Sequence, residues 1–111
     1  MERFVKGDIV VVPFPFSDLS QTKKRPAFVI SDLPGDDIIL CQITSQNVRD
    51  DFAIEISAAD FSLGNLPETN SNIRTNKIFT ADKKIILKKA GKLHSNKISE
   101  IISKIIDIIK S

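Results

Sequence analysis

Short runs of β-branched and apolar residues follow one another closely along most of the chain, and no helical pattern separates them. Proline, glycine or small polar residues bound each run, which is typical of strands joined by turns. The runs expected to form strands are 9–12, 27–30, 38–44, 52–57, 73–80 and 85–89. Because connections this short cannot hold crossover helices, we expect an antiparallel sheet that closes into a small barrel to limit its edges.

The end of the sequence has a different period. Isoleucines recur at positions 98, 101, 102, 105, 106, 108 and 109, while serine, lysine and acidic residues occupy the opposite arc of a helical projection. This spacing predicts a C-terminal amphipathic helix, with Ser95 as its N-cap. Isoleucine is a mediocre helix former, so we expect the helix to depend on packing against the sheet.

The composition sets limits on organisation and chemistry. With 111 residues, positions 1–111 are expected to form a single domain. One cysteine, Cys41, excludes an internal disulfide and a multi-thiolate metal site, and one histidine, His94, excludes two-histidine catalysis. We interpret Cys41 as a buried strand residue and His94 as a turn or cap residue. The charged start of the chain does not resemble a signal peptide, and we expect a cytoplasmic protein.

Charge is divided unevenly along the chain. Residues 1–76 contain seven Lys or Arg and eleven Asp or Glu, whereas residues 77–111 contain nine Lys and three acids. A basic C-terminal third is compatible with a polyanionic partner such as nucleic acid, and it is equally compatible with a solvated lysine-rich surface.

Four segments occur in a fixed order along nearly the whole chain. They are GDIV at 7–10, KRPAFVIS at 24–31, ITS at 43–45 and IRTNKIFT at 73–80. In this order and spacing, and with the terminal helix, the sequence resembles the MazF/PemK family of toxin–antitoxin toxins.

The resemblance implies an SH3-like β-barrel with a C-terminal α-helix, assembled as a homodimer. It further implies the toxin of a type II toxin–antitoxin system, a sequence-specific endoribonuclease that cleaves single-stranded RNA without a metal or other cofactor. A cognate antitoxin would be the protein partner, and its extended C-terminal segment would cover the RNA groove.

The same resemblance assigns Arg25 and Thr44 as catalytic residues. Metal-free RNA cleavage uses the 2′-hydroxyl of the substrate as nucleophile, so the protein must stabilise a charged phosphorane and transfer protons. The planar guanidinium of arginine donates two hydrogen bonds to phosphate oxygens, and a threonine hydroxyl can donate a further one. Lys23, Lys24, Arg74 and Lys77 are the expected RNA-binding residues.

The sequence departs from the family in the loop before Arg25. Many relatives carry Gly-x-Glu or histidine there, whereas this loop has Asp18 as its one acid, which makes Asp18 the candidate general base. Asn76 stands where some relatives have aspartate after the strand arginine. These departures leave an alternative: a non-catalytic barrel that binds nucleic acid or inhibits a protein target, as the CcdB toxins do.

Overall fold

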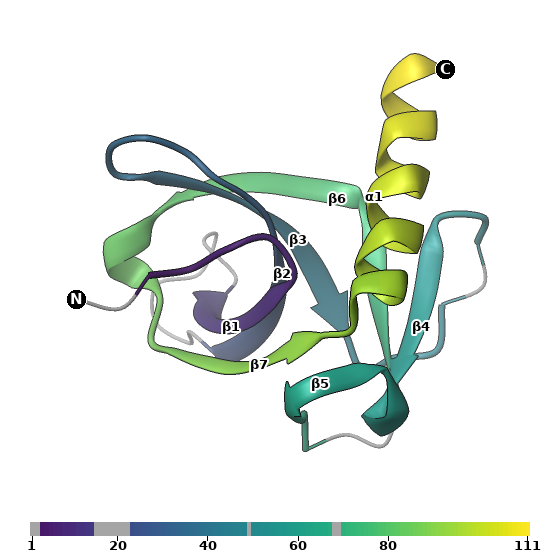
Figure 1. Cartoon of the computed structure of the whole chain (residues 1–111), viewed down its shortest axis with the longest axis horizontal. Helices are drawn as coiled ribbons and strands as arrows, with labels where there is room; N and C mark the ends of the chain where they lie inside the picture. The colour runs from purple at the N-terminus through teal and green to yellow at the C-terminus, as the bar shows by residue number, and fades with distance from the viewer. Residues whose placement is uncertain (1–2, 15–22, 49, 68–69) are drawn as a thin grey trace.

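The computed structural model describes residues 3–14, 23–48, 50–67 and 70–111 (Figure 1). Within these ranges the chain forms seven strands, two short 3₁₀ turns and one helix. In chain order they are β1 (Asp8–Phe14), β2 (Lys23–Asp32), β3 (Asp37–Thr44), β4 (Ala53–Ser57), η1 (Ala58–Asp60), β5 (Phe61–Gly64), β6 (Asn70–Asp82), η2 (Lys83–Ile85), β7 (Lys88–Leu93) and α1 (Ser95–Lys110). The expected fold class, mainly β with a C-terminal helix, is confirmed.

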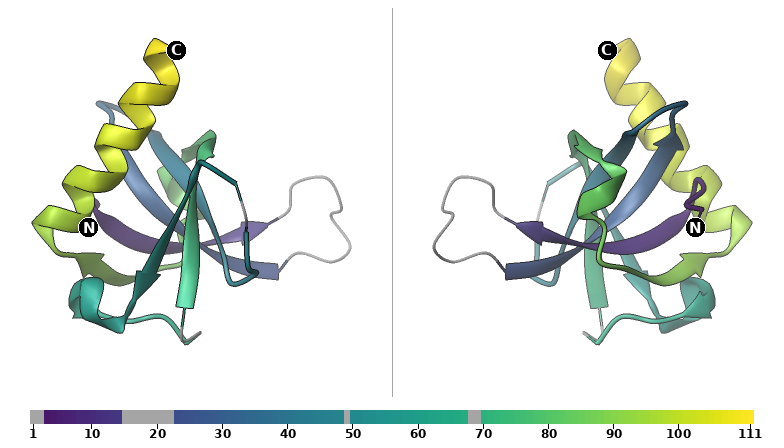
Figure 2. Two further views of the ribbon diagram at one scale, coloured as in Figure 1. Left: turned by 90° about the vertical axis from the view of Figure 1, so that its right-hand side faces the viewer. Right: turned by 90° about the vertical axis from the view of Figure 1, so that its left-hand side faces the viewer.

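All strands belong to one antiparallel sheet in the order β4-β6-β3-β2-β1-β7-β5. The sheet is strongly curled, and α1 lies against one side of it (Figures 1 and 2). The strand at Phe61–Gly64 is not among the runs that the sequence analysis expected to form strands. The last strand begins at Lys88 rather than at residue 85, because residues 83–85 form a 3₁₀ turn.

The curled sheet has a hydrophobic core on each face. One core packs against the helix, through Ile9, Phe28, Ile43, Ile56, Phe61, Leu66, Ile73, Leu93, Ile101 and Ile105 together with Cys41. The other fills the inside of the curl, with Phe4, Val10, Val12, Ala27, Val29, Ile38, Leu40 and Ala81. Successive side chains of β1 and β2 therefore alternate between the two cores, as the period of two in a strand requires.

Prolines mark the place where β1 and β2 leave the middle of the sheet. The pairing of β7 with β1 ends at Val11, so Pro13 has a strand neighbour, β2, on one side only. Likewise, the pairing of β2 with β3 begins at Ala27, one residue after Pro26. Because proline lacks a backbone N–H, it is tolerated at these positions and would not be in a fully paired strand. Figure 2 shows β1 and β2 extending together away from the rest of the sheet.

Gly7 and Asp8 fix the start of β1 against the helix. Gly7 has a φ of 94°, and the Ile98 side chain of α1 occupies the space that a β-carbon would need. The buried Asp8 carboxylate accepts a hydrogen bond from Val5 N at 2.8 Å and pairs with Lys89 Nζ at 3.2 Å. The Gly-Asp dipeptide is thus structural in this chain.

The helix begins one residue earlier than expected. His94, not Ser95, is the N-cap, and its side chain makes no capping hydrogen bond. Ile101 and Ile105 are buried, and Ile98 and Ile102 pack against the same core. Ile109 is 71% exposed, because the last turns project beyond the sheet (Figures 1 and 2). The isoleucine face is therefore docked as far as Ile105, and the last turn is not. None of the described helices is long and apolar enough to span a membrane.

Candidate functional site

Arg25 and Thr44 lie just beyond the paired part of two neighbouring strands. The pairing of β2 with β3 reaches Ala27 and Gln42, and Arg25 and Thr44 each stand two residues past this pair. Because side chains alternate along a strand, Arg25 and Thr44 belong to the same face of the sheet as Ala27 and Gln42. Both residues are half-buried. The register therefore puts the two side chains that the family resemblance assigned to catalysis at the same end of β2 and β3, on one face.

The guanidinium of Arg25 is available for a ligand. It makes no ion pair with any other residue in the described part of the chain. Its backbone is fixed between Val12 of β1 and the rigid ring of Pro26. An arginine held by a strand and not neutralised by a carboxylate is suited to bind a phosphate group.

The hydroxyl of Thr44 has a defined hydrogen-bonding role. Thr44 Oγ1 accepts a hydrogen bond from Gln46 N at 3.1 Å, and the carbonyl of Gln46 accepts one from Asn72 Nδ2, also at 3.1 Å. Asn72 is 8% exposed and pairs with Thr44 across the sheet. Because one lone pair of Thr44 Oγ1 is used locally, its O–H remains free to donate to a substrate oxygen. The sequence analysis missed Asn72 and Gln46, which no motif singles out.

Arg74 is engaged in a local ion pair. Its Nη2 lies 3.4 Å from Asp50 Oδ2, and the same aspartate accepts hydrogen bonds from the backbone N–H groups of Phe52 and Ala53 at 2.9 Å. These backbone hydrogen bonds, aided by the charge of Arg74, lower the pKa of the Asp50 carboxyl. A carboxylate stabilised in this way is a poor general base.

The Arg74 backbone is tied to β3 by the buried thiol of Cys41, which donates a hydrogen bond to the Arg74 carbonyl at 2.8 Å. Burial raises the pKa of this thiol to about 12, so Cys41 is the inert buried residue that the sequence predicted.

The expected RNA-binding lysines lie at different places around Arg25. Lys23 and Lys24 are exposed at the start of β2, and alternation along the strand puts Lys23 on the face of Arg25 and Lys24 on the opposite face. Lys77 is exposed in β6 and immediately precedes Ile78, which pairs with Cys41 of β3. Asp18, the candidate base, lies outside the described residues.

A cavity of about 230 Å³ adjoins Arg25. Strands β1, β2, β3 and β6, the segment before β6 and the start of β7 contribute to it. Its lining residues are Val11, Lys24, Arg25, Pro26, Ile43, Ser45, Leu66, Pro67, Ser71 and Lys88. Lys88, Ser45 and Ser71 were not singled out in the sequence, because only the fold brings them beside Lys24 and Arg25.

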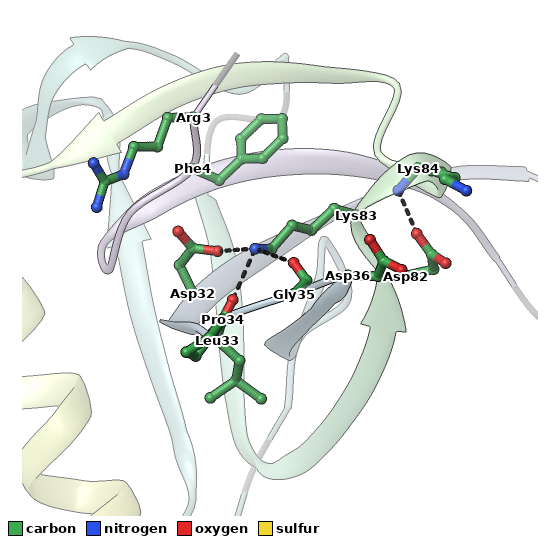
Figure 3. A pocket seen from close by; sticks show the side chains of 10 residues that line it. All are labelled: Arg3, Phe4, Asp32, Leu33, Pro34, Gly35, Asp36, Asp82, Lys83 and Lys84. Atoms are coloured by element: carbon green, nitrogen blue, oxygen red, sulfur yellow. Dashed lines mark hydrogen bonds and ion pairs between the residues drawn. The ribbon is translucent and has the colours of Figure 1, made fainter. Parts of the chain in front are cut away.

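A larger cavity, of about 760 Å³, lies at the opposite end of β2 (Figure 3). Its central cation is already neutralised, since Lys83 Nζ lies 2.6 Å from Asp32 Oδ1 and donates to the carbonyls of Leu33 and Gly35 at 2.8 Å. Asp36 and Asp82 add two further carboxylates to the walls. These contacts tie the β2–β3 turn to η2. Arg3 and Lys84 also line the cavity, so its positive and negative side chains balance and it carries no excess of positive charge for a phosphate group.

No group of three or more His, Cys, Asp or Glu side chains that could hold a metal ion occurs among the described residues. At Arg25 and Thr44, the guanidinium and the hydroxyl can donate hydrogen bonds to an anion. A phosphodiester is the biological anion that fits a site with a guanidinium, a hydroxyl donor and nearby lysines.

Comparison with known proteins identifies relatives of this chain. The family model described as PemK-like, MazF-like toxin of type II toxin–antitoxin system matches residues 5–109. No curated protein matches the sequence closely enough to count as a relative.

Several solved structures share the fold. An endoribonuclease in complex with its cognate antitoxin, from a mycobacterial species, aligns with a TM-score of 0.74 at 13% identity, covering 97% of this chain and 96% of the other. The MazE–MazF structure (Form II) from Deinococcus radiodurans gives a TM-score of 0.75 at 18% identity, covering 96% and 95%. The Mycobacterium tuberculosis toxin MazF-mt6 gives a TM-score of 0.70 at 12% identity, covering 93% of this chain and 96% of the other. At these identities the likeness establishes a common fold.

Proposed function

This chain belongs to the family of PemK-like, MazF-like toxins of type II toxin–antitoxin systems, and on that premise we propose that it is an endoribonuclease that cleaves single-stranded RNA without a metal ion. The observation that carries the proposal is that Arg25 and Thr44 stand on the same face of β2 and β3, each two residues beyond the pair of Ala27 with Gln42. Family membership favours this activity over a non-catalytic barrel that only binds nucleic acid or inhibits another protein.

The reaction begins when the 2′-hydroxyl of a nucleotide attacks the adjacent phosphorus. The O2′–P bond forms, the P–O5′ bond breaks, and the proton lost from the 2′-oxygen is balanced by one delivered to the leaving 5′-oxygen. Arg25 donates to the non-bridging oxygens, where charge accumulates in the phosphorane, and Thr44 donates its O–H to the same group. Asp18 is the proposed base that accepts the 2′-hydroxyl proton.

Substrate attraction comes from the lysines around the site. Lys23, Lys24 and Lys77 are exposed and make no ion pair with another described residue, so each can contact a phosphate group of the RNA. Arg74 would have to exchange Asp50 for a phosphate, which makes it a weaker contact than the lysines. Binding through such contacts weakens as salt concentration rises.

The proposal includes the assembly and partners expected of the family. The chain acts as a single domain and as a homodimer in the cytoplasm, and a cognate antitoxin neutralises it. The structures of related toxins with an antitoxin, the mycobacterial complex and MazE–MazF, support this partner.

The activity is tested by incubating the purified protein with a mixed pool of single-stranded RNA in EDTA. We expect cleavage by the wild-type protein and by an Arg3→Ala control, since Arg3 lines the cavity at the far end of β2. We expect at least a hundredfold loss of rate in Arg25→Ala. Intact RNA with the wild-type protein would overturn the proposed activity.

A further inference from the structure

The cavity beside Arg25 has a local excess of positive charge. Lys24, Arg25 and Lys88 line it, and none of them makes an ion pair with another described residue. Its described lining contains no carboxylate, whereas three carboxylates line the cavity at the other end of β2. The charge of this cavity therefore favours an anionic ligand.

The floor of the cavity is apolar. Val11, Pro26, Ile43 and Leu66 form it, and Ile43 and Leu66 belong to the buried core beneath. Apolar side chains do not stabilise a small hydrated anion. They do stabilise a bound flat ring, because its apolar surface is removed from water. The ligand that fits both features carries a negative charge and an apolar ring.

Two serine hydroxyls complete the walls. Ser71 is only 2% exposed, yet its hydroxyl has no hydrogen-bond partner among the described residues. Among the described residues the fully buried side-chain atoms without a partner are Asp8 Oδ1 and Arg74 Nε, so the Ser71 hydroxyl is open to the cavity and can pair with a ligand there. Ser45 lies on the same cavity, one residue after Thr44. Hydroxyls can both donate and accept, as the edges of nucleobases require.

We propose that this cavity binds one nucleotide of the RNA next to the cleaved bond and that Ser71, Leu66 and Lys88 help to set the sequence preference. The proposal rests on the proposed ribonuclease function. Arg25 itself lines the cavity, between Lys24 and Pro26 of β2, so a nucleotide bound there lies next to a phosphate held by Arg25. Lys24 and Lys88 then pair with the phosphate of the bound nucleotide.

The test is cleavage of a pool of randomised single-stranded RNAs, with the bases flanking each cut read by sequencing. Ser71→Ala and Leu66→Phe should change the base preference at one flanking position by roughly fivefold, the effect of one hydrogen bond or a filled cavity. Lys88→Gln and Lys92→Gln each remove one positive charge from β7, and Lys92→Gln serves as the control. Only Lys88→Gln, which changes the cavity, should alter the base preference. Unchanged preference in Ser71→Ala and Leu66→Phe variants that still cleave would overturn the proposal.

A second measurement separates this inference from the proposed function. If the wild-type protein cleaves no RNA, nucleoside 5′-monophosphates are titrated into it and the amide chemical shifts are followed. Shifts at Leu66, Ser71 and Lys88 that are lost in Lys88→Gln would support the nucleotide site while the ribonuclease activity is abandoned. Absence of shifts, or shifts confined to other residues, would overturn the nucleotide site as well.

Discussion

Arg25 is the side chain on which the proposed chemistry depends, because it is fixed by a strand and by Pro26 and is not neutralised by a described carboxylate. Lysine carries the same charge but not the planar fork that binds two phosphate oxygens. A substitution by lysine should therefore retain RNA binding and lose most of the cleavage rate.

Thr44 acts together with a residue that has no chemical role of its own. Asn72 holds the carbonyl of Gln46, whose N–H occupies one lone pair of the Thr44 hydroxyl. We expect Asn72→Ala to lower kcat about tenfold with little change in KM, because the turn no longer fixes the donor. In a Thr44→Val background the same substitution should have no further effect on kcat. Additive losses would show that Asn72 acts independently of Thr44.

Cys41 gives a stability prediction whose sign follows from its pKa. Burial raises the thiol pKa from 9.0 to about 12 in the folded protein, so the folded state holds this proton more tightly than the unfolded state. The stability from the neutral thiol is complete below pH 9 and is lost as the pH rises towards 12.

The measurement compares the free energy of unfolding of wild type and Cys41→Ala by urea titration. The difference between them should shrink as the pH increases from 8 to 10.5. A pH-independent difference would contradict the burial of an ionisable thiol at this position.

At the scale of elements, the helix is where periodicity was most informative. Its isoleucine spacing predicts the helix and its buried face, but not that burial of this face ends at Ile105, before the last turn. Ile101 is fully buried, while Ile109 is 71% exposed. A large loss of stability is therefore expected for a substitution at Ile101 rather than at Ile102, which is only half-buried.

We expect Ile101→Ala to lower the free energy of unfolding by about 2–5 kcal/mol, the usual range for a deleted core isoleucine. Ile109→Ala removes the same atoms from the solvent-exposed surface and should change the free energy of unfolding by less than about 0.5 kcal/mol. Chemical denaturation of both variants measures the difference. Similar losses would mean that the last turn of α1 packs as tightly as its middle.

The strands show which features a sequence can reveal. Runs of β-branched residues predicted most of them, but β5 has only four residues, none of them β-branched, and it depends on pairing with β7. That pairing needs the close approach of Gly91 to the backbone of Leu63, a tertiary feature with no local signal. The register that puts Arg25 and Thr44 on one face of β2 and β3 is likewise set by contacts between distant segments. Family resemblance, not spacing, identified that pair.

For the whole molecule, the fold gives the uneven charge of the chain a more specific meaning. The acidic first part holds Arg25 and Lys24, and the basic last part contributes Lys88 to the same cavity. Most other lysines of the last part lie elsewhere, and Lys83 and Lys84 line the cavity at the far end of β2. The basic third is thus mostly surface, with one lysine brought to the site by the curl of the sheet.

This arrangement predicts the salt dependence of RNA binding. For an uncleavable 2′-O-methyl RNA, Lys88→Gln should reduce the slope of log Kd against log salt by about 0.7, the contribution of one phosphate contact on a single strand. Lys84→Gln makes the same change in net charge at the far cavity and should leave the slope unchanged. Equal effects of the two substitutions would indicate that only overall charge attracts RNA.

The central claim, that Arg25 and Thr44 support attack by the 2′-hydroxyl without a metal ion, is tested most directly by single-turnover cleavage of a defined RNA in EDTA. The same RNA with a 2′-deoxy nucleotide at the cut site serves as the comparison. We predict that wild type cleaves only the unmodified RNA and that Arg25→Ala and Thr44→Val lower its rate. Cleavage of the 2′-deoxy substrate, or an unchanged rate in Arg25→Ala, would contradict the mechanism.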